Sequence, residues 1–240
     1  MESPKRSTRI GSLNEKPLHA ALKKWIAGPH DQFEVSVDGF VIDIVQGDFL
    51  VEIQTKNFAS IKRKIMTLTV GHKVRLVYPI AREKWIVKRA TGRGGEVGDR
   101  RKSPKRGGLE QIFEELVAFP KLIANPNFSL MLLLIREEEL RRYDATRGWR
   151  RKGWVTEERR LLEVVDQRLI ESTEDMGAFI PSGLPGPFTT SDLAAALGQT
   201  RRFAQKMAYC LREMGVIARA GTRARANLYE RSVDANRTVE

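Results

Sequence analysis

The most regular pattern in the chain lies between Phe33 and Lys56, where apolar and polar residues alternate with the period of two that is typical of β-strands. Two short turn signals, Asp38-Gly39 and Gly47-Asp48, interrupt the alternation. Both are of the residue types that form two-residue hairpin loops. The pattern therefore predicts a meander of three antiparallel strands.

Loops of this length fix which residues face one another across the strands. Counting outward from the turns places Glu34 opposite Asp43, and Asp43 opposite Glu52. Because side chains alternate between the faces of a strand, Gln54 and Lys56 are expected on the same face as Glu52. The other face is expected to be apolar, formed by Ile42, Ile44, Val51 and Ile53.

Like charges placed directly opposite one another destabilise a sheet, so the repulsion between these acids requires an offset. A Mg²⁺ ion is suited to this role because it binds hard oxygen ligands, usually one or two carboxylates together with water and phosphate oxygens. The competing interpretation is a solvated outer face. Three acids in register, followed by Gln54 and Lys56, favour a metal site.

At these residues the sequence resembles the PD-(D/E)xK nuclease superfamily, whose core is a helix, a three-strand meander, a second helix and a further strand. Asp43 resembles the superfamily's metal-binding aspartate, and Glu52-Ile53-Gln54 resembles its E-x-K element, with glutamine where lysine is usual. The resemblance covers about the first ninety residues.

The resemblance implies that Asp43 and Glu52 bind Mg²⁺ or Mn²⁺, helped by Glu34 or Glu15, and that Gln54 orients the attacking water. Three lysines are available to replace the missing lysine of the motif: Lys56, Lys62 and Lys64. A degenerate, inactive site is the alternative.

Periodicity elsewhere predicts an α/β fold with a mixed β-sheet core flanked by helices, of the restriction-endonuclease-like kind. Helices are expected over residues 14–28, 58–71, 109–119 and 158–170, and strands over 73–80, 84–89 and 130–142, with a helix as the alternative for 130–142. We predict six segments: a disordered basic arm (1–12), a nuclease-like domain (13–90), a basic Gly-rich linker or loop (91–108), a connecting α+β region (109–185), a winged-helix domain (186–232) and a tail (233–240).

The C-terminal segment contains two predicted helices joined by a tight turn, SDLAAALG and RRFAQKMAYCLREMG, and then two short strands that flank the basic stretch AGTRARA. This order resembles a winged helix-turn-helix. The resemblance implies DNA contacts from the second helix and the hairpin: Arg201, Arg202, Gln205, Lys206, Arg219, Arg223 and Arg225. Lys62 and Lys64 are further candidates for steering phosphate. Many winged helices bind protein instead, so a protein partner stays open.

A second basic stretch, RGWRRKGW, interleaves Trp149 and Trp154 with arginines. Aromatic side chains among cations can stack on bases while the cations hold phosphates. They can also be buried anchors of a hairpin, which is the interpretation we favour here.

Composition narrows the class of partner. Lys and Arg total 42 against 30 Asp and Glu, giving a formal net charge of +12, which indicates a polyanionic partner such as DNA. The single cysteine, Cys210, has no partner for an internal disulfide, as is usual in a reducing cytoplasm. No apolar run is long enough to span a bilayer. We therefore expect a cytoplasmic protein without a membrane partner.

The sequence thus predicts a metal-dependent nuclease that hydrolyses DNA phosphodiester bonds and is targeted by a C-terminal winged helix, with double-stranded DNA favoured over RNA. The alternative is a non-catalytic DNA-binding protein that uses a degenerate nuclease fold as a scaffold or a dimer surface. A homodimer is compatible with both.

Overall fold

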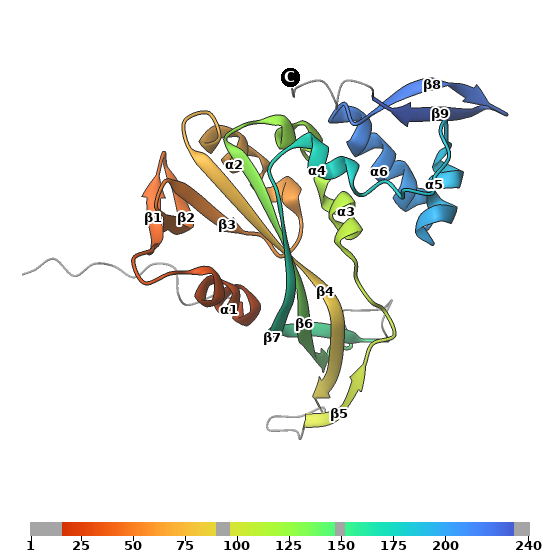
Figure 1. Cartoon of the computed structure of the whole chain (residues 1–240). Helices are drawn as coiled ribbons and strands as arrows, with labels where there is room; N and C mark the ends of the chain where they lie inside the picture. Colours follow the sequence, from red (N-terminus) through yellow and green to blue (C-terminus); the bar gives the residue numbers. More distant parts are fainter. Residues whose placement is uncertain (1–15, 90–96, 147–151, 233–240) are drawn as a thin grey trace, which may run out of the picture.

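The computed structural model describes residues 16–89, 97–146 and 152–232. Its centre is a mixed sheet with the strand order β1-β2-β3-β4-β6-β7, and β5 pairs with the distal part of β4 (Figure 1). The strands are β1 (Gln32–Val37), β2 (Phe40–Gln46), β3 (Phe49–Ile53), β4 (Lys73–Arg89), β5 (Val97–Lys102), β6 (Phe128–Tyr143) and β7 (Trp154–Ile170). The expected α/β class with a mixed sheet flanked by helices is confirmed.

The three-strand meander is confirmed together with both of its turns. Val37 pairs with Phe40 and Gln46 pairs with Phe49, as two-residue loops require. The meander follows α1 (Pro17–Ile26) and precedes η2 (Phe58–Ile61), α2 (Lys62–Leu68) and then β4, which runs parallel to β3. The described chain therefore has the order of helix, meander, helix and strand that the sequence predicts.

Helices cover both faces of the meander, so the expectation of one apolar and one open polar face is wrong. Ile44, Val51 and Ile53 pack with the apolar stripe of α1. Ile42 packs on the opposite face, in the core that includes residues of η2 and α2. Ile42 and Ile44 are two residues apart on β2, so simple alternation would place them on one face, and it does not hold between them. The pairing of β1 with β2 is also irregular at Glu34, whose φ of 55° departs from strand geometry.

Three other predictions are corrected by the long strands of the sheet. Residues 73–89 form one strand where two are predicted, and part of the predicted linker is strand β5. Residues 158–170, predicted as a helix, belong to β7. Pairing with β6 along almost the whole of β7 overrides the helical spacing of its leucines, and Leu162 and Leu169 remain exposed. The strands of 109–185 thus complete the sheet begun in 13–90.

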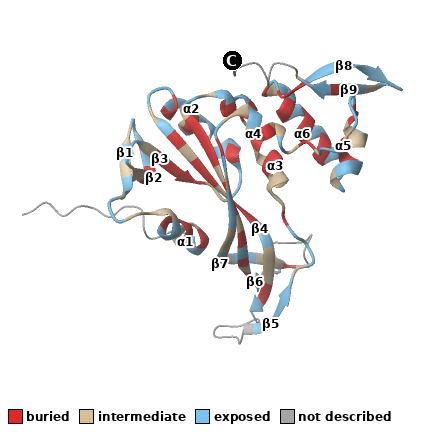
Figure 2. Ribbon diagram, viewed as in Figure 1, coloured by how far each residue is buried: buried red, intermediate tan, exposed pale blue. Residues whose placement is uncertain are grey.

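The helical layer on the second face connects the sheet to the C-terminal segment. It contains η3 (Leu109–Ile112), α3 (Phe113–Leu116), η4 (Pro120–Ala124) and α4 (Thr173–Gly177). The C-terminal elements are α5 (Thr190–Leu197), α6 (Arg201–Glu213), β8 (Ile217–Arg223) and β9 (Ala226–Arg231). The buried face of α6 joins the same core as α2 and α3, and it appears as a red stripe in Figure 2.

The C-terminal helix pair and hairpin occur where the sequence predicts them, with a longer hairpin. Thr189 forms a capping box at the start of α5, and Gly198 in the left-handed conformation ends it. The hairpin turn lies at Ala224 and Arg225, both with positive φ, so β8 extends through most of the predicted tip. The basic arm (1–12) and the tail (233–240) lie outside the described residues.

Candidate active site

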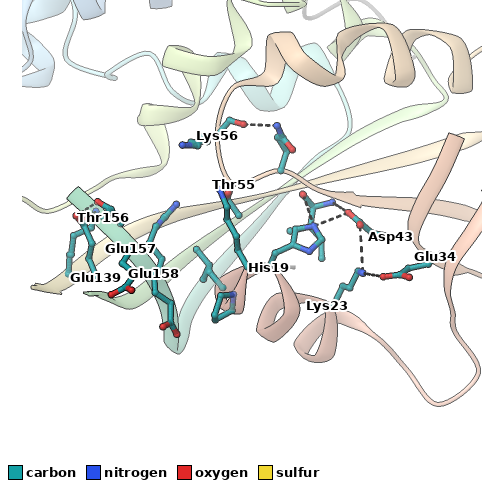
Figure 3. Close-up of a pocket in the computed structure, with 17 residues that line it drawn as sticks. His19, Lys23, Glu34, Asp43, Thr55, Lys56, Glu139, Thr156, Glu157 and Glu158 are labelled. Carbon is teal, nitrogen blue, oxygen red and sulfur yellow. Dashed lines mark hydrogen bonds and ion pairs between the residues drawn. The ribbon is translucent and has the colours of Figure 1, made fainter. Parts of the chain in front are cut away.

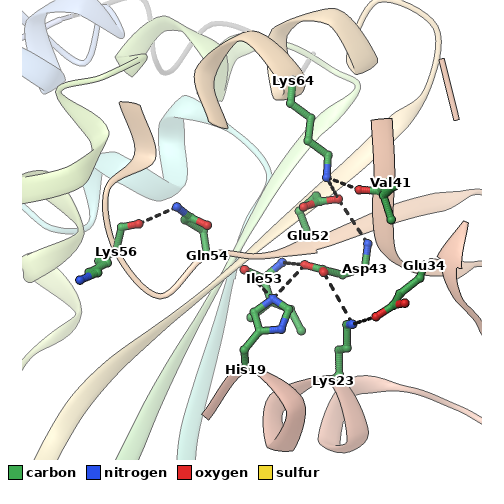
Figure 4. A network of polar contacts seen from close by, with 10 residues as sticks. All are labelled: His19, Lys23, Glu34, Val41, Asp43, Glu52, Ile53, Gln54, Lys56 and Lys64. Atoms are coloured by element: carbon green, nitrogen blue, oxygen red, sulfur yellow. Dashed lines mark hydrogen bonds and ion pairs between the residues drawn. The ribbon is translucent and has the colours of Figure 1, made fainter. Parts of the chain in front are cut away.

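The predicted acidic pair lies where β2 and β3 diverge. The pairing of β2 with β3 ends towards this point at Ile44 and Val51, and beyond it the side chain of Asp43 enters the gap between the strands (Figure 4). Its Oδ2 accepts a hydrogen bond of 2.8 Å from the N–H of Ile53, and its own N–H donates to Oε1 of Glu52 over 3.3 Å. We call this point, formed by Asp43 and Glu52, the fork.

On one side of the fork, cationic and polar side chains of α1 contact the acids. Lys23 Nζ lies 3.2 Å from Glu34 Oε1 and 3.9 Å from Asp43 Oδ1. His19 Nε2 lies 3.2 Å from Asp43 Oδ2 and 3.1 Å from the carbonyl oxygen of Ile53. Asp43 and Glu34 are therefore linked through Lys23.

The charge of Glu52 is balanced by Lys64 of α2, which lies on the other side of the sheet. The two side chains form an ion pair, and Lys64 also donates to the carbonyl of Val41. The three predicted acids consequently do not share one face, since Glu34 and Asp43 contact α1 while Glu52 contacts α2. Side chains of the protein offset the repulsion for which the sequence analysis invoked a metal ion.

The two fork carboxyls differ in proton affinity. Burial raises the pKa of Asp43, but the hydrogen bond and charge of His19, the N–H of Ile53 and the charge of Lys23 outweigh it, so the net pKa is below its usual value. Burial, reinforced by the charge of Asp43, raises the pKa of Glu52 to about 7, and the ion pair with Lys64 opposes this only in part. Glu52 therefore titrates near neutral pH.

Gln54 and Lys56 do not point at the acids. The side-chain amide of Gln54 donates to the carbonyls of Lys56 and Asn57, at 2.6 and 3.1 Å, and to Ser60 Oγ at 3.2 Å. It braces the connection from β3 to η2, which leaves the predicted water-orienting role without geometric support. Among the candidate lysines, Lys64 contacts the fork and Lys62 is exposed on α2.

The fork borders a pocket of about 710 Å³ (Figure 3). One wall is α1 with Asp43 and Glu34, and Gln54 and Lys56 line the adjoining loop. The far wall comes from β4, β6 and β7 and was not predicted from the sequence. Its lining side chains are Lys84, Glu139, Thr156, Glu157, Glu158 and Arg159.

Buried charged side chains of β4, β6 and β7 form a network beneath the far wall, which we call the charged floor of the pocket. Lys84 Nζ lies 2.9 Å from both Glu137 Oε1 and Glu139 Oε2, and Arg159 binds the second oxygen of Glu137. Burial raises the pKa of Glu139, but hydrogen bonds from Arg141, Thr156 and Lys84 outweigh it and lower the pKa to about 2. The side chain of Glu137 is 0% exposed and that of Glu139 is 4% exposed, whereas Lys84 remains 28% exposed and reaches the pocket.

The described ranges contain no group of three His, Cys, Asp or Glu side chains that is arranged to hold a metal ion. Glu15, the remaining acidic candidate, lies outside those ranges. The described acids at the fork are thus Asp43 and Glu52, with Glu34 joined to them through Lys23.

The candidate DNA-binding residues of the C-terminal segment are partly exposed. Arg201, Arg202 and Gln205 lie on the exposed face of α6, and Arg219 and Arg225 are exposed on the hairpin. Lys206 instead pairs with Glu114 of α3, and Arg223 pairs with Asp192 of α5. Tyr209 and Arg212 continue the exposed face of α6 and were not singled out from the sequence.

The fold and the site define an α/β protein whose mixed sheet carries an acidic strand fork beside a charged pocket. Residues 16–171 match the family model described as "Domain of unknown function (DUF8091)", and the chain belongs to this family. The match begins at α1 and ends after β7, so it contains the whole seven-stranded sheet.

The chain is also similar to an "Uncharacterized protein" of Treponema pallidum (strain Nichols). The two are 30% identical over 224 residues, which cover 92% of this chain and 87% of that protein. No solved structure gives a match. No helix in the described part of the chain has both the length and the apolar character needed to cross a membrane.

Proposed function

We propose that the protein is a metal-dependent nuclease that hydrolyses DNA phosphodiester bonds at the fork. The observation that carries this proposal is the meeting of Asp43 and Glu52 where β2 and β3 diverge. It occurs within the order of helix, meander, helix and strand that the PD-(D/E)xK resemblance implies. The net charge of +12 supports a polyanionic substrate.

The donor atoms at the fork suit a hard divalent ion. His19 Nε2 lies within 3.2 Å of both Asp43 Oδ2 and the carbonyl oxygen of Ile53, so the two oxygens already converge on one point. Carboxylate and carbonyl oxygens are the ligands that Mg²⁺ and Mn²⁺ prefer. Asp43 and Glu52 would hold the ion, with Glu34 as a third carboxylate after release from Lys23. A bound ion would polarise the scissile phosphate and lower the pKa of the attacking water.

Lys64 is the lysine best placed to replace the one missing from the E-x-K element. Its ammonium group is held beside the fork by Glu52 and the carbonyl of Val41. With Glu52 holding a metal ion, Lys64 would supply positive charge beside the fork and would stabilise the negative charge that develops on the reacting phosphate. Gln54 has a positioning role, because its amide fixes the loop that follows β3.

The exposed residues of α6 and the hairpin support a second contact with DNA. Arg201, Arg202 and Gln205 occupy the start of α6, which corresponds to a recognition helix in the winged-helix resemblance. In this proposal they hold duplex DNA while the sheet domain carries out the chemistry. The protein would act in the cytoplasm.

The proposed chemistry is tested by incubating the full chain with duplex and single-stranded DNA in Mg²⁺, Mn²⁺ or EDTA. Cleavage in either metal and none in EDTA is the expected result.

A second candidate function is metal-independent DNA binding, and one observation favours it: Lys23, His19 and Lys64 already contact the acids at the site. Salt-sensitive binding without cleavage under all three conditions would replace the nuclease proposal with this one.

Replacing Lys64 with alanine is expected to lower the cleavage rate about a hundredfold while metal binding is retained, because the substitution removes charge stabilisation and frees Glu52. Cleavage kinetics and calorimetric titration with Mn²⁺ measure the two effects. Lys62→Ala is the matched control, since Lys62 is exposed on the same helix. Equal cleavage rates for the two variants would remove Lys64 from the mechanism.

A further inference from the structure

The part of the sheet beyond the candidate pocket has one face that the described helices leave uncovered (Figure 1). On β6 this face begins under α1 with Leu133 and Ile135, which are buried in the apolar core that α1 covers. It continues through Glu137, Glu139 and Arg141. The change from apolar to charged residues occurs where the cover of α1 ends, so the charged half of the face is available for contact.

Strand register places basic side chains from four strands on this face. Lys84 pairs with Glu137, and Lys88 pairs with Arg141, so both lysines of β4 project on the same side. Arg101 of β5 pairs with Ile86, two residues from each lysine. Arg159 and Trp154 of β7 pair with Glu139 and Tyr143. We call the six members of this row the track: Lys84, Lys88, Arg101, Arg141, Trp154 and Arg159.

Two of the acids of this face, Glu137 and Glu139, lie beneath the cations, whereas Asp99 of β5 is exposed and lines the second pocket beside Arg101. Glu137 and Glu139 are 0% and 4% exposed, while Lys84 and Arg159 are 28% and 25% exposed and Lys88 and Arg101 are exposed. The buried carboxylates hold cations in place and contribute little to the surface. The track therefore offers a positive surface with fixed side chains, which suits a row of phosphates.

A second pocket, of about 330 Å³, lies at the far end of the track. Lys88, Arg101 and the indole of Trp154 line it. Lys88 Nζ lies 4.4 Å from the centre of the indole ring, and Tyr143 packs edge-on against the same ring. A cation on an exposed aromatic ring is bound more weakly than a stacked base, so a base can displace Lys88 from the ring and leave it free for a phosphate.

We propose that the track binds one strand of nucleic acid, with a base stacked on Trp154 and the backbone leading along the sheet into the pocket at the fork. Lys84 and Lys88 are four residues apart on one strand, which separates them by roughly 13 Å and allows them to contact successive parts of an extended backbone. A continuous duplex keeps the faces of its bases stacked on one another. The favoured ligand is therefore a single strand, a flap or a frayed end.

This inference deepens the proposed function and rests on it for the choice of nucleic acid as the partner. Trp154 packs against Tyr143 in the β6–β7 hairpin, as the interpretation of a hairpin anchor expects, and in this proposal its partly buried indole also stacks on a base. Trp149 lies outside the described residues.

The test is binding of the full chain to a fluorescent oligothymidine of about 15 nucleotides, followed by anisotropy in EDTA so that no cleavage occurs. Arg101→Ala is expected to weaken binding about fivefold. The matched control is Arg100→Ala, because Arg100 is the adjacent residue and pairs with Glu138 on the opposite face. It is expected to leave the affinity within about twofold of the wild type.

Trp154→Ala is expected to weaken binding of the oligothymidine about tenfold and to leave binding of an abasic oligonucleotide of the same length unchanged. Thermal unfolding checks that this variant keeps its fold, so that weakened binding of both probes cannot be ascribed to a loss of folding. Equal affinities for Arg100→Ala and Arg101→Ala, equal weakening of both probes by Trp154→Ala, or tighter binding of a duplex with the same dependence on Trp154 would each overturn the track. Asp43→Asn separates the two proposals, because it is expected to remove cleavage and to retain oligothymidine binding.

Discussion

Replacing Asp43 with asparagine is expected to lower metal-dependent DNA cleavage by at least about a hundredfold. The substitution keeps the size of the side chain but removes the charge that a divalent ion requires. Asp43 is the carboxyl whose pKa is held below its usual value, so it is ionised throughout the neutral range and is the primary anionic ligand of the proposed site. Initial cleavage rates in Mg²⁺ and Mn²⁺ measure the effect.

Asp48→Asn is the matched control, because Asp48 is an exposed acid in the β2–β3 turn of the same hairpin. It is expected to cleave at the wild-type rate. Asp43→Asn is expected to keep the fold, because the amide oxygen of asparagine can still accept the hydrogen bond from the Ile53 N–H. Thermal unfolding of both variants checks this. Undiminished cleavage by Asp43→Asn would move the active site away from the fork.

The second large effect concerns stability. Lys84→Ala is expected to lower the free energy of unfolding by about 3 kcal/mol, because it removes the ammonium group that lies 2.9 Å from both Glu137 and Glu139. The expected loss is at the lower end for a broken buried ion pair, since Arg159 still contacts Glu137 and Arg141 still contacts Glu139. Denaturant unfolding at neutral pH measures it.

Lys105→Ala serves as the control for this stability measurement, because Lys105 is exposed and its removal is expected to change the unfolding free energy by less than about 0.5 kcal/mol. A further comparison is Lys84→Met, which retains apolar bulk without the charge. If Lys84→Ala and Lys84→Met are both as stable as the control, the two glutamates do not depend on Lys84, and the charged floor of the pocket is held by the arginines alone.

The meander could be predicted from the sequence because its information is local. Two-residue turns at Asp38-Gly39 and Gly47-Asp48 fix the register without reference to the rest of the chain, and both observed registers agree. The helices on either side follow from apolar spacing in the same way. The proximity of Asp43 and Glu52 is a direct consequence of that register.

The faces of the meander could not be predicted from alternation alone. Ile42 and Ile44 lie two residues apart on β2 but belong to different cores, so the regular alternation that the prediction assumed does not hold around Asp43. The cations at the fork depend on tertiary packing, because Lys23 comes from α1 and Lys64 from α2. The contact of His19 with Asp43 likewise depends on the packing of α1 against the meander.

The far wall of the pocket was missed because β7 was predicted as a helix. If residues 158–170 form a helix, Arg159 is not expected to pair with Glu139 across two strands. The charged residues of β6 are then expected to face solvent. The alternation of Glu137, Glu139 and Arg141 was the available signal, and it becomes informative once the partner strand carries complementary charges. The prediction failed at the pairing of β7 with β6, because the helical spacing of the leucines in β7 concealed it.

Calorimetric titration of the full chain with Mn²⁺ and Mg²⁺, compared with Asp43→Asn, decides whether the fork is a metal site. We expect binding to the wild-type protein that is lost in the variant, since the fork supplies the ionised carboxylate. If neither ion binds the wild-type protein, with or without single-stranded DNA, or if both proteins bind them equally, the fork is not a metal site and the metal-dependent nuclease proposal is contradicted.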